Sequence, residues 1–308
     1  MSALAPLLTS LRASISSKDR SGAAQTGVPG VTFFWLDEDR PRSPLLYDTG
    51  IVIVGQGYKE GFLDDREFRY DAESCLVLGV PLPFECASYG SPEEPLLGIR
   101  IDIELPMLHS LVARFSGQLD FGPASQDTVH AGVEPLRMDG PLLAAVSRLL
   151  QSLGDPMDQA LIGPAAVEEI VYRILRSEHG RVLYALTEQH SPYANIAKAL
   201  ERIHGEFANG LSVEDLAKES AMGVSSFHRS FKDVTGETPL QYLKKVRLLK
   251  AKNLLVYEGK RVEEAAHAVG YASPSQFSRE FKRYFSVPPS EAQTLPYSDA
   301  LQPGILGP

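Results

Sequence analysis

Between residues 31 and 104, the hydrophobic positions fall into short runs that are typical of β-strands. The runs at 31–36, 51–54 and 75–80 are apolar and rich in β-branched or aromatic residues. At 97–103, leucine and isoleucine alternate with glycine, arginine and aspartate, so one face of that strand is apolar. Many short strands at this spacing predict a β-sandwich or a small β-barrel.

After Glu104 the apolar residues recur every three or four positions, which predicts helices. We expect helices at 106–115, 141–150 and 167–175, and nearly continuous helix from Pro192 onward. The helices at 141–150 and 167–175 have wide apolar faces. These faces would either pack inside the chain or form a dimer interface between two copies.

The pattern also predicts the division of the chain. Residues 1–30 are expected to hold a short amphipathic helix and then a loop at 21–30, and 177–192 is expected to be a connection that can include helical turns. This gives four parts: a tail or helix at 1–30, a β domain with appended helices at 31–180, a helical domain at 193–292, and a tail at 293–308. The predicted fold class is α+β.

Two segments of the helical region resemble each other. Residues 213–217 read VEDLA and 262–266 read VEEAA, and 225–232 read SSFHRSFK where 275–282 read SQFSREFK. The offset makes each unit about fifty residues long, and such a repeat is a structural unit.

Each repeat has the pattern of a helix-turn-helix, with a tight turn at 222–223 or 270–271 between its two helices. Phenylalanines four positions apart fall on one face of the second helix and are expected in the core. They are Phe227 and Phe231 in the first repeat and Phe277 and Phe281 in the second. Arg229 and Arg279 fall elsewhere on these helices and are expected to reach solvent.

Residues 238–255 join the repeats and are expected to form one long linker helix. Thr238 can cap it, Pro239 suits its first turn, and no glycine or proline follows before Gly259. A rigid helix fixes the separation of the two units. Recognition helices about 34 Å apart would enter successive major-groove turns on one face of DNA.

Charge is distributed unevenly along the chain. The net charge is −9, but residues 193–292 hold 15 Lys+Arg against 12 Asp+Glu, whereas residues 1–192 hold 15 against 26. The helical domain is therefore the part suited to meet DNA phosphates. Cys75 and Cys86 give no disulfide framework, and no apolar run suits a membrane helix or signal peptide. We therefore expect a cytoplasmic protein with no membrane partner.

At this point the sequence resembles the AraC/XylS-type regulators over about residues 193–292. The residues that carry the resemblance are Ala217, Ser225, Phe227, Arg229, Phe231, Lys232, Gly236, Pro239, Tyr242, Arg247, Leu248, Ala251, Leu254, Leu255, Val262, Ala266, Gly270, Tyr271, Ser275, Phe277, Arg279, Phe281, Lys282 and Pro288. Two departures affect only the C-terminal end of the domain: Ser286 stands where the family usually has glycine, and 290–292 replaces its usual Tyr-Arg close.

The resemblance implies that the second helix of each unit lies in the major groove. By motif position, the candidates for base contacts are Ser225, His228, Arg229, Ser275, Gln276, Ser278 and Arg279. The candidates for phosphate contacts are Lys232, Lys244, Lys245 and Lys282. Arg229 and Arg279 would either hydrogen bond to guanine or contact phosphate, and His228 and the lysines are equally consistent with solvated surface.

The N-terminal half is similar to the regulatory domain of one branch of these regulators at 47–57, 78–83 and 95–105. The resemblance implies a cupin-like β-barrel followed by helices, which senses a signal or forms a homodimer. Four aromatic residues are weak candidates for lining a pocket for a small-molecule effector, with core packing as the alternative: Trp35, Tyr47, Tyr58 and Tyr89.

A metal site and a catalytic site are not expected. His109 and His130 are isolated, no His-x-His occurs, and no phosphate loop or nucleophile elbow is present. No cofactor is therefore predicted, and Arg100 and Asp102 are interpreted as solvated rather than catalytic.

The predicted function is sequence-specific binding of double-stranded promoter DNA. The family implies a homodimer that contacts RNA polymerase. Two alternatives stay open: a cupin-type metal enzyme fused to a DNA-binding module, and a helical scaffold whose C-terminal region binds protein. The operator, the effector and the direction of regulation do not follow from the sequence.

Overall fold

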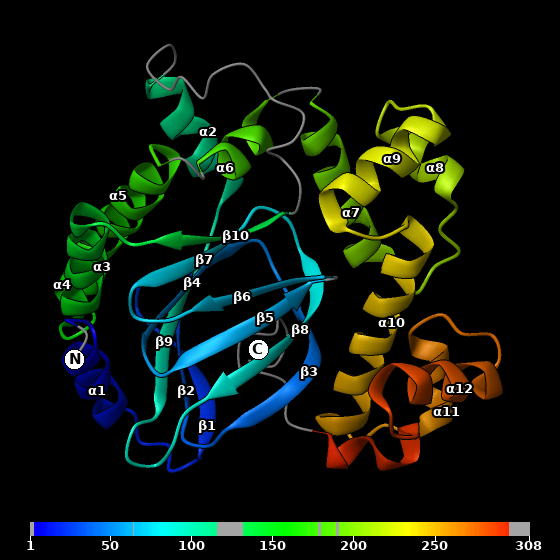
Figure 1. Ribbon diagram of the computed structural model, residues 1–308, viewed down its shortest axis with the longest axis horizontal. Helices are drawn as coiled ribbons and strands as arrows, with labels where there is room; N and C mark the ends of the chain where they lie inside the picture. Colours follow the sequence, from blue (N-terminus) through cyan, green and yellow to red (C-terminus); the bar gives the residue numbers. More distant parts are fainter. Residues whose placement is uncertain (1–2, 64, 116–131, 178–179, 189–190, 296–308) are drawn as a thin grey trace.

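Two antiparallel β-sheets form the core of the N-terminal part in the computed structural model, which describes residues 3–63, 65–115, 132–177, 180–188 and 191–295 (Figure 1). The larger sheet has, in spatial order, β1 (Ser21–Gln25), β2 (Val31–Leu36), β9 (Leu96–Asp102), β4 (Gly50–Gln56), β7 (Ser74–Leu78) and β10 (Val133–Arg137). The smaller sheet has β3 (Arg40–Tyr47), β8 (Leu82–Tyr89), β5 (Tyr58–Leu63) and β6 (Arg66–Tyr70). Side chains of both sheets belong to one hydrophobic core.

The larger sheet is covered on both faces, which explains the continuous apolar runs of its strands. Every residue of β2 is buried, as are the first six of β4. Helix α1 (Ala5–Ser14) packs on β4 and β9, and Gly55 makes room for it, because a Cβ there would lie 2.3 Å from a methyl group of Leu8. The apolar face of β9 is buried as its alternation predicts.

Helices cover the sheets on the side of α1 and at the end above β10 in the view (Figure 1). They are α2 (Leu105–Arg114), α3 (Gly140–Ser152), α4 (Pro156–Leu161), α5 (Gly163–Leu175) and α6 (Arg181–Thr187). The helices expected at 106–115, 141–150 and 167–175 are confirmed. The apolar stripes of α3 and α5 are buried within the chain, so the core interpretation of these stripes holds.

The structure corrects two expectations about this region and refines a third. Residues 21–30 are not simply a loop, because β1 pairs with β2 at the sheet edge, where Gly22 leaves room for the ring of Trp35. The connection at 177–192 contains α6, whose Val182 and Leu183 are buried. Arg100 is not solvated: its side chain is 13% exposed and pairs with Asp102 at 2.5 Å and Asp48 at 3.8 Å.

The C-terminal part is entirely helical in the residues that the structure describes. Its elements are α7 (Pro192–Glu206), α8 (Val213–Glu219), α9 (Val224–Thr235), α10 (Pro239–Val256), α11 (Val262–Ala268), α12 (Pro274–Phe285) and a short 3-10 helix, η1 (Pro289–Thr294). The linker helix predicted at 238–255 is α10, and Thr238 and Gln241 close its first turn with a capping box. The expected tail at 293–308 lies almost wholly outside the described residues.

Helix α10 joins the two parts of the molecule. It packs on β3 and β8 of the smaller sheet (Figure 1). The hydroxyl group of Tyr242 on α10 donates a hydrogen bond of 2.7 Å to the carbonyl oxygen of Pro81. The amide of Gly132, just before β10, also donates to the carbonyl of Val234 at the end of α9. Of the helices in the described ranges, none has the length and apolarity needed to cross a membrane.

Candidate nucleic-acid interface

The first helix-turn-helix consists of α8 and α9. Ser212 caps α8 by accepting a hydrogen bond from the amide of Asp215 at 3.0 Å. Phe227 and Phe231 of α9 are fully buried, with ring centroids 5.6 Å apart, and the ring of Phe231 meets the edge of Tyr242 on α10. These contacts fix the inner face of α9 against the linker helix.

The second helix-turn-helix, α11 and α12, has the same construction. Phe277 and Phe281 are fully buried with centroids 5.5 Å apart, which confirms their predicted core role. Gly270 forms the turn with φ +85°, and a Cβ there would lie 2.4 Å from the carbonyl oxygen of Ala208. The turn therefore requires glycine both for its backbone angle and for its contact with the chain after α7.

The faces of α9 and α12 that point away from these cores are polar and exposed. The exposed candidates are Ser225, His228, Arg229 and Lys232 on α9, and Ser275, Gln276, Arg279 and Lys282 on α12; Ser278 is half-buried. Arg283 is also exposed and lies four positions after Arg279, and both line a shallow hollow with Gln276 and Glu280. Its i+4 spacing from Arg279 is the signal that sequence reasoning missed.

Two of the predicted phosphate candidates, Lys244 and Lys245, have partners inside the domain. Lys245 pairs with the buried carboxylate of Glu237, and the Lys244 ammonium lies 3.1 Å from a carboxylate oxygen of Glu280. Both ammonium groups therefore hold α10 to its neighbours, and neither is a free charge like that of Lys232.

Glu280 links the second recognition helix to the rest of the domain. Its carboxylate accepts hydrogen bonds from the Tyr271 hydroxyl at 2.9 Å, from Lys244 and from the Gln276 amide at 3.3 Å. Burial raises the pKa of Glu280, but these hydrogen bonds outweigh burial and leave the pKa below its usual value. The charged carboxylate thus orients α12 between α10 and the turn at Tyr271.

The aromatic pocket candidates lie in the β domain. Trp35 is buried and donates to the carbonyl oxygen of Asp19, and Tyr47 is buried with its hydroxyl 2.7 Å from that of Tyr70. Tyr58 and Tyr89 stack on each other with ring centroids 4.4 Å apart. All four therefore pack against neighbouring side chains or strands.

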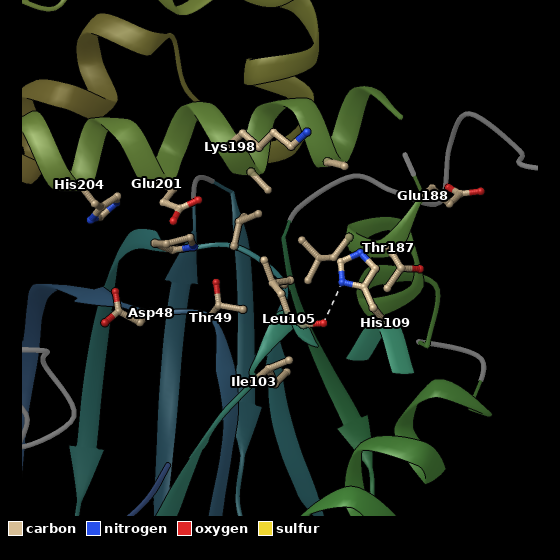
Figure 2. A pocket seen from close by; sticks show the side chains of 16 residues that line it. Asp48, Thr49, Ile103, Leu105, His109, Thr187, Glu188, Lys198, Glu201 and His204 are labelled. Carbon is tan, nitrogen blue, oxygen red and sulfur yellow. Dashed lines mark hydrogen bonds between the residues drawn. The ribbon is translucent and has the colours of Figure 1, made fainter. Parts of the chain in front are cut away.

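A cavity that sequence reasoning missed lies between the β domain and α7 (Figure 2). Its volume is about 540 Å³, and none of the four aromatic candidates lines it. Val80, Ile103 and Leu186 contribute apolar walls, and Asp48 and His204 lie at one end. No sequence pattern points to it, because its walls come from five separate segments.

His204 is the polar group of this cavity that contacts the linker helix. Its Nε2 lies 2.7 Å from the hydroxyl oxygen of Tyr242. Burial, assisted by the positive charge of Lys250, lowers the pKa of His204 to about 4, so the ring is neutral at pH 7. Among the described residues, no group of three His, Cys, Asp or Glu side chains could hold a metal; His130 lies outside them.

Comparison with known proteins identifies both parts of the chain. Residues 27–182 match the model of the AraC-type transcriptional regulator N-terminus, and residues 216–294 match a helix-turn-helix domain. An AraC-like transcription regulator of Streptomyces lividans is 28% identical over 190 residues, covering 58% of this chain and 62% of the relative. The transcriptional activator RhaS of Yersinia pestis is 26% identical over 181 residues, covering 58% of this chain and 64% of RhaS.

The matched region thus spans less than two thirds of the length of these curated relatives. Among solved structures, ToxT from Vibrio cholerae is similar with a TM-score of 0.59 at 12% identity, covering 88% of this chain and 99% of ToxT. A second ToxT structure, described as bound to an unsaturated fatty acid, has a TM-score of 0.56 at 14% identity and covers 91% of this chain and 98% of ToxT. At these identities the likeness shows the fold: an N-terminal β domain joined to a C-terminal helical domain.

The first family model covers half of the chain, and the second, from residue 216 on, covers most of the first repeat and all of the second. Because the model matched over half of the chain is one of transcription regulators, the metal-enzyme alternative is set aside. The chain belongs to the AraC-type transcriptional regulators.

Proposed function

We propose that this chain binds promoter DNA in a sequence-specific manner through α9 and α12 and thereby regulates transcription. The observation that carries the proposal is the repeated placement of one arginine. Arg229 and Arg279 each lie between two fully buried phenylalanines in sequence, yet both are exposed on a helix whose inner face is fixed. Such a helix can enter a major groove without rearranging.

Within this proposal the exposed residues divide by chemistry. Arginine makes paired hydrogen bonds to guanine, each worth about 1–3 kcal/mol of discrimination, whereas lysine meets phosphate as a point charge. We therefore assign base contacts to Arg229 and Arg279, and phosphate contacts to Lys232, Lys282 and Arg283. Ser225, His228, Ser275, Gln276 and Ser278 remain base candidates by their positions, and Lys244 and Lys245 act within the domain.

The test uses the full chain and DNA that it selects itself. Repeated selection from random double-stranded DNA should yield a preferred sequence. Arg279→Ala should then weaken binding to that sequence by about tenfold or more, with a far smaller effect on unrelated DNA. Lys282→Ala should weaken both alike and lower the salt dependence by about one counterion.

Lys18→Ala, at an exposed lysine between α1 and β1, is the control and should change neither affinity. A selection that enriches no sequence would contradict the proposal. Equal losses on both DNAs for Arg279→Ala would move that arginine to the phosphate contacts.

The remaining parts of the proposal concern partners. RhaS is named a transcriptional activator, so we assign activation to this chain, through contact between its DNA-bound form and RNA polymerase in the cytoplasm. The β domain, as a cupin-like regulatory domain, would respond to a small-molecule effector, as the fatty acid-bound ToxT suggests by its fold.

A homodimer is proposed as the active form, with α4 at its interface, because three exposed large apolar residues follow one another closely there. Met157 and Leu161 are 72% and 69% exposed, and Ile162 after them is 47% exposed. Burial of these side chains against a second copy would favour dimerisation. Leu161→Glu should shift sedimentation toward the monomer; Leu240→Glu, at an exposed leucine on α10, should not.

A further inference from the structure

We propose that the cavity between the β domain and α7 binds a small apolar molecule carrying a positively charged amine, and that the His204–Tyr242–Pro81 bridge transmits its presence to the DNA-binding helices. The binding step stands independently of the proposed function, whereas the transmission rests on it.

The cavity has the size and walls of a small-molecule site. Its volume of about 540 Å³ falls within the roughly 300–1,000 Å³ typical of ligand pockets. Apolar side chains from both parts of the molecule form the walls: Val80, Pro81, Ile103, Leu105, Leu186, Ala194 and Ala197. A ligand with a hydrocarbon body would displace water from this surface.

The charged residues favour a cation. Asp48, Glu188 and Glu201 line the cavity against a single lysine, Lys198. In Figure 2 the carboxylates of Asp48 and Glu201 lie on opposite sides of one end, with Thr49 below Glu201, and the ammonium group of Lys198 points away from this end. An amine placed here would face two carboxylates, whereas a carboxylate ligand would be repelled by both.

The groups around Asp48 leave this preference in place. Arg100 lies 3.8 Å from Asp48, but it also pairs with Asp102 at 2.5 Å, so its charge is shared. The positive charge of Lys250, on α10, acts to lower the pKa of both Asp48 and His204. Burial raises the pKa of the Asp48 carboxyl, whereas the charges of Arg100 and Lys250 lower it, and a cation bound nearby would further favour the charged carboxylate.

The same end of the cavity contains the bridge between the two parts of the molecule. His204 and Pro81 both line the cavity. The Tyr242 hydroxyl oxygen lies 2.7 Å from Nε2 of His204 and 2.7 Å from the carbonyl oxygen of Pro81. The hydroxyl has one hydrogen, which it donates to Pro81, so His204 donates its Nε2 hydrogen to Tyr242. A ligand that moves His204 or Pro81 therefore changes how α7 and α10 are held to the β domain.

Calorimetry on the full chain at pH 7.5 tests the site with three probes of equal length: n-octylamine, n-octanoate and n-octanol. We expect one saturable site for octylamine, with an affinity about tenfold or more above that for octanoate. Glu201→Gln should weaken octylamine binding about fivefold and leave octanol binding unchanged.

Because the chain has a net charge of −9, amines can also bind its surface. Glu214→Gln, at an exposed carboxylate of α8 that does not line the cavity, controls for this and should leave octylamine affinity unchanged. Octanoate binding as tightly as octylamine, no saturable octylamine site, or equal effects of the two glutamine variants would each overturn the proposed site.

DNA binding with and without octylamine tests the transmission step. With the wild-type chain, saturating octylamine should change the affinity for the selected DNA, and Tyr242→Phe should abolish that change while still binding octylamine. An unchanged DNA affinity in the wild-type chain would overturn the transmission step. If the chain bound no DNA at all, the proposed function would fail, and calorimetry would still decide the cavity.

Discussion

The Nε2 atom of His204 lies 2.7 Å from the hydroxyl oxygen of Tyr242, and this pair joins α7 and α10 where both approach Pro81 of the β domain. Tyr242 is fully buried, and its ring also packs against the core phenylalanine Phe231 of the first helix-turn-helix. One side chain thus contacts the core of a recognition helix, a cavity-lining histidine and the β domain.

Tyr242→Phe removes only the hydroxyl and keeps the ring in the core. We expect the free energy of unfolding, measured in urea, to fall by about 1–2 kcal/mol, because the Pro81 carbonyl and His204 each lose a partner. Amide hydrogen exchange in α7 and α10 should increase. Tyr58→Phe is the control, since Tyr58 packs on Tyr89 through its ring; an equal loss in both variants would contradict a special role for the bridge.

His204 makes stability depend on acidity. Its pKa is lowered to about 4 in the folded chain, whereas an unfolded histidine titrates near 6.5. As pH falls below about 6.5, His204 becomes protonated in the unfolded chain but stays neutral in the folded chain. The folded chain therefore loses about 2–3 kcal/mol of stability between pH 6.5 and 4.

His204→Gln removes this titration and keeps an amide donor for Tyr242. The free energy of unfolding should therefore fall less between pH 7.5 and 4.5 in this variant than in the wild-type chain. His267→Gln, at an exposed histidine of α11, should behave like the wild type. A wild-type chain and a His204→Gln variant with parallel pH profiles would rule out a buried neutral histidine.

The parts of the structure that the sequence predicted are those that local pattern determines. Phe277 and Arg279 fall on opposite sides of one helix because of helical periodicity alone, and the cap at Thr238 and the linker helix follow from a few adjacent residues. The buried face of each recognition helix was predictable for the same reason.

What the sequence did not reveal depends on contacts between distant segments. Strand β1 has small residues and no alternation of apolar and polar positions. It lies at a sheet edge, where Gly22 makes room for the ring of Trp35. The cavity has Asp48 and His204 at the same end, although His204 lies more than a hundred residues further along the chain. Lys244 has the pattern of a phosphate contact, and only the fold pairs it with Glu280.

Glu280→Ala should loosen α12. It leaves the Tyr271 hydroxyl and the Lys244 ammonium without their shared acceptor, so we expect a loss of about 1–3 kcal/mol in the stability of the second helix-turn-helix. Hydrogen exchange of the α12 amides and DNA affinity are the measurements. Glu258→Ala, which removes a surface ion pair with Lys260, should cost less than about 1 kcal/mol; equal exchange in the two variants would count against a positioning role for Glu280.

Ser286 ends α12 in the left-handed region, with φ +64°, at the position where the resemblance to the family leads us to expect glycine. A side chain in this region brings its Cβ close to the backbone, at a cost of roughly 1–2 kcal/mol that glycine avoids. The flexibility of glycine in the unfolded chain offsets part of this gain.

Ser286→Gly should therefore raise the free energy of unfolding by about 1 kcal/mol, measured by thermal or urea unfolding. Gly236→Ala is the matched opposite, because Gly236 ends α9 with φ +78° and alanine there should be destabilising by a similar amount. DNA affinity should not change in Ser286→Gly, because Ser286 follows the exposed face of α12. A Ser286→Gly chain that is no more stable than the wild type would mean that the end of α12 is not strained.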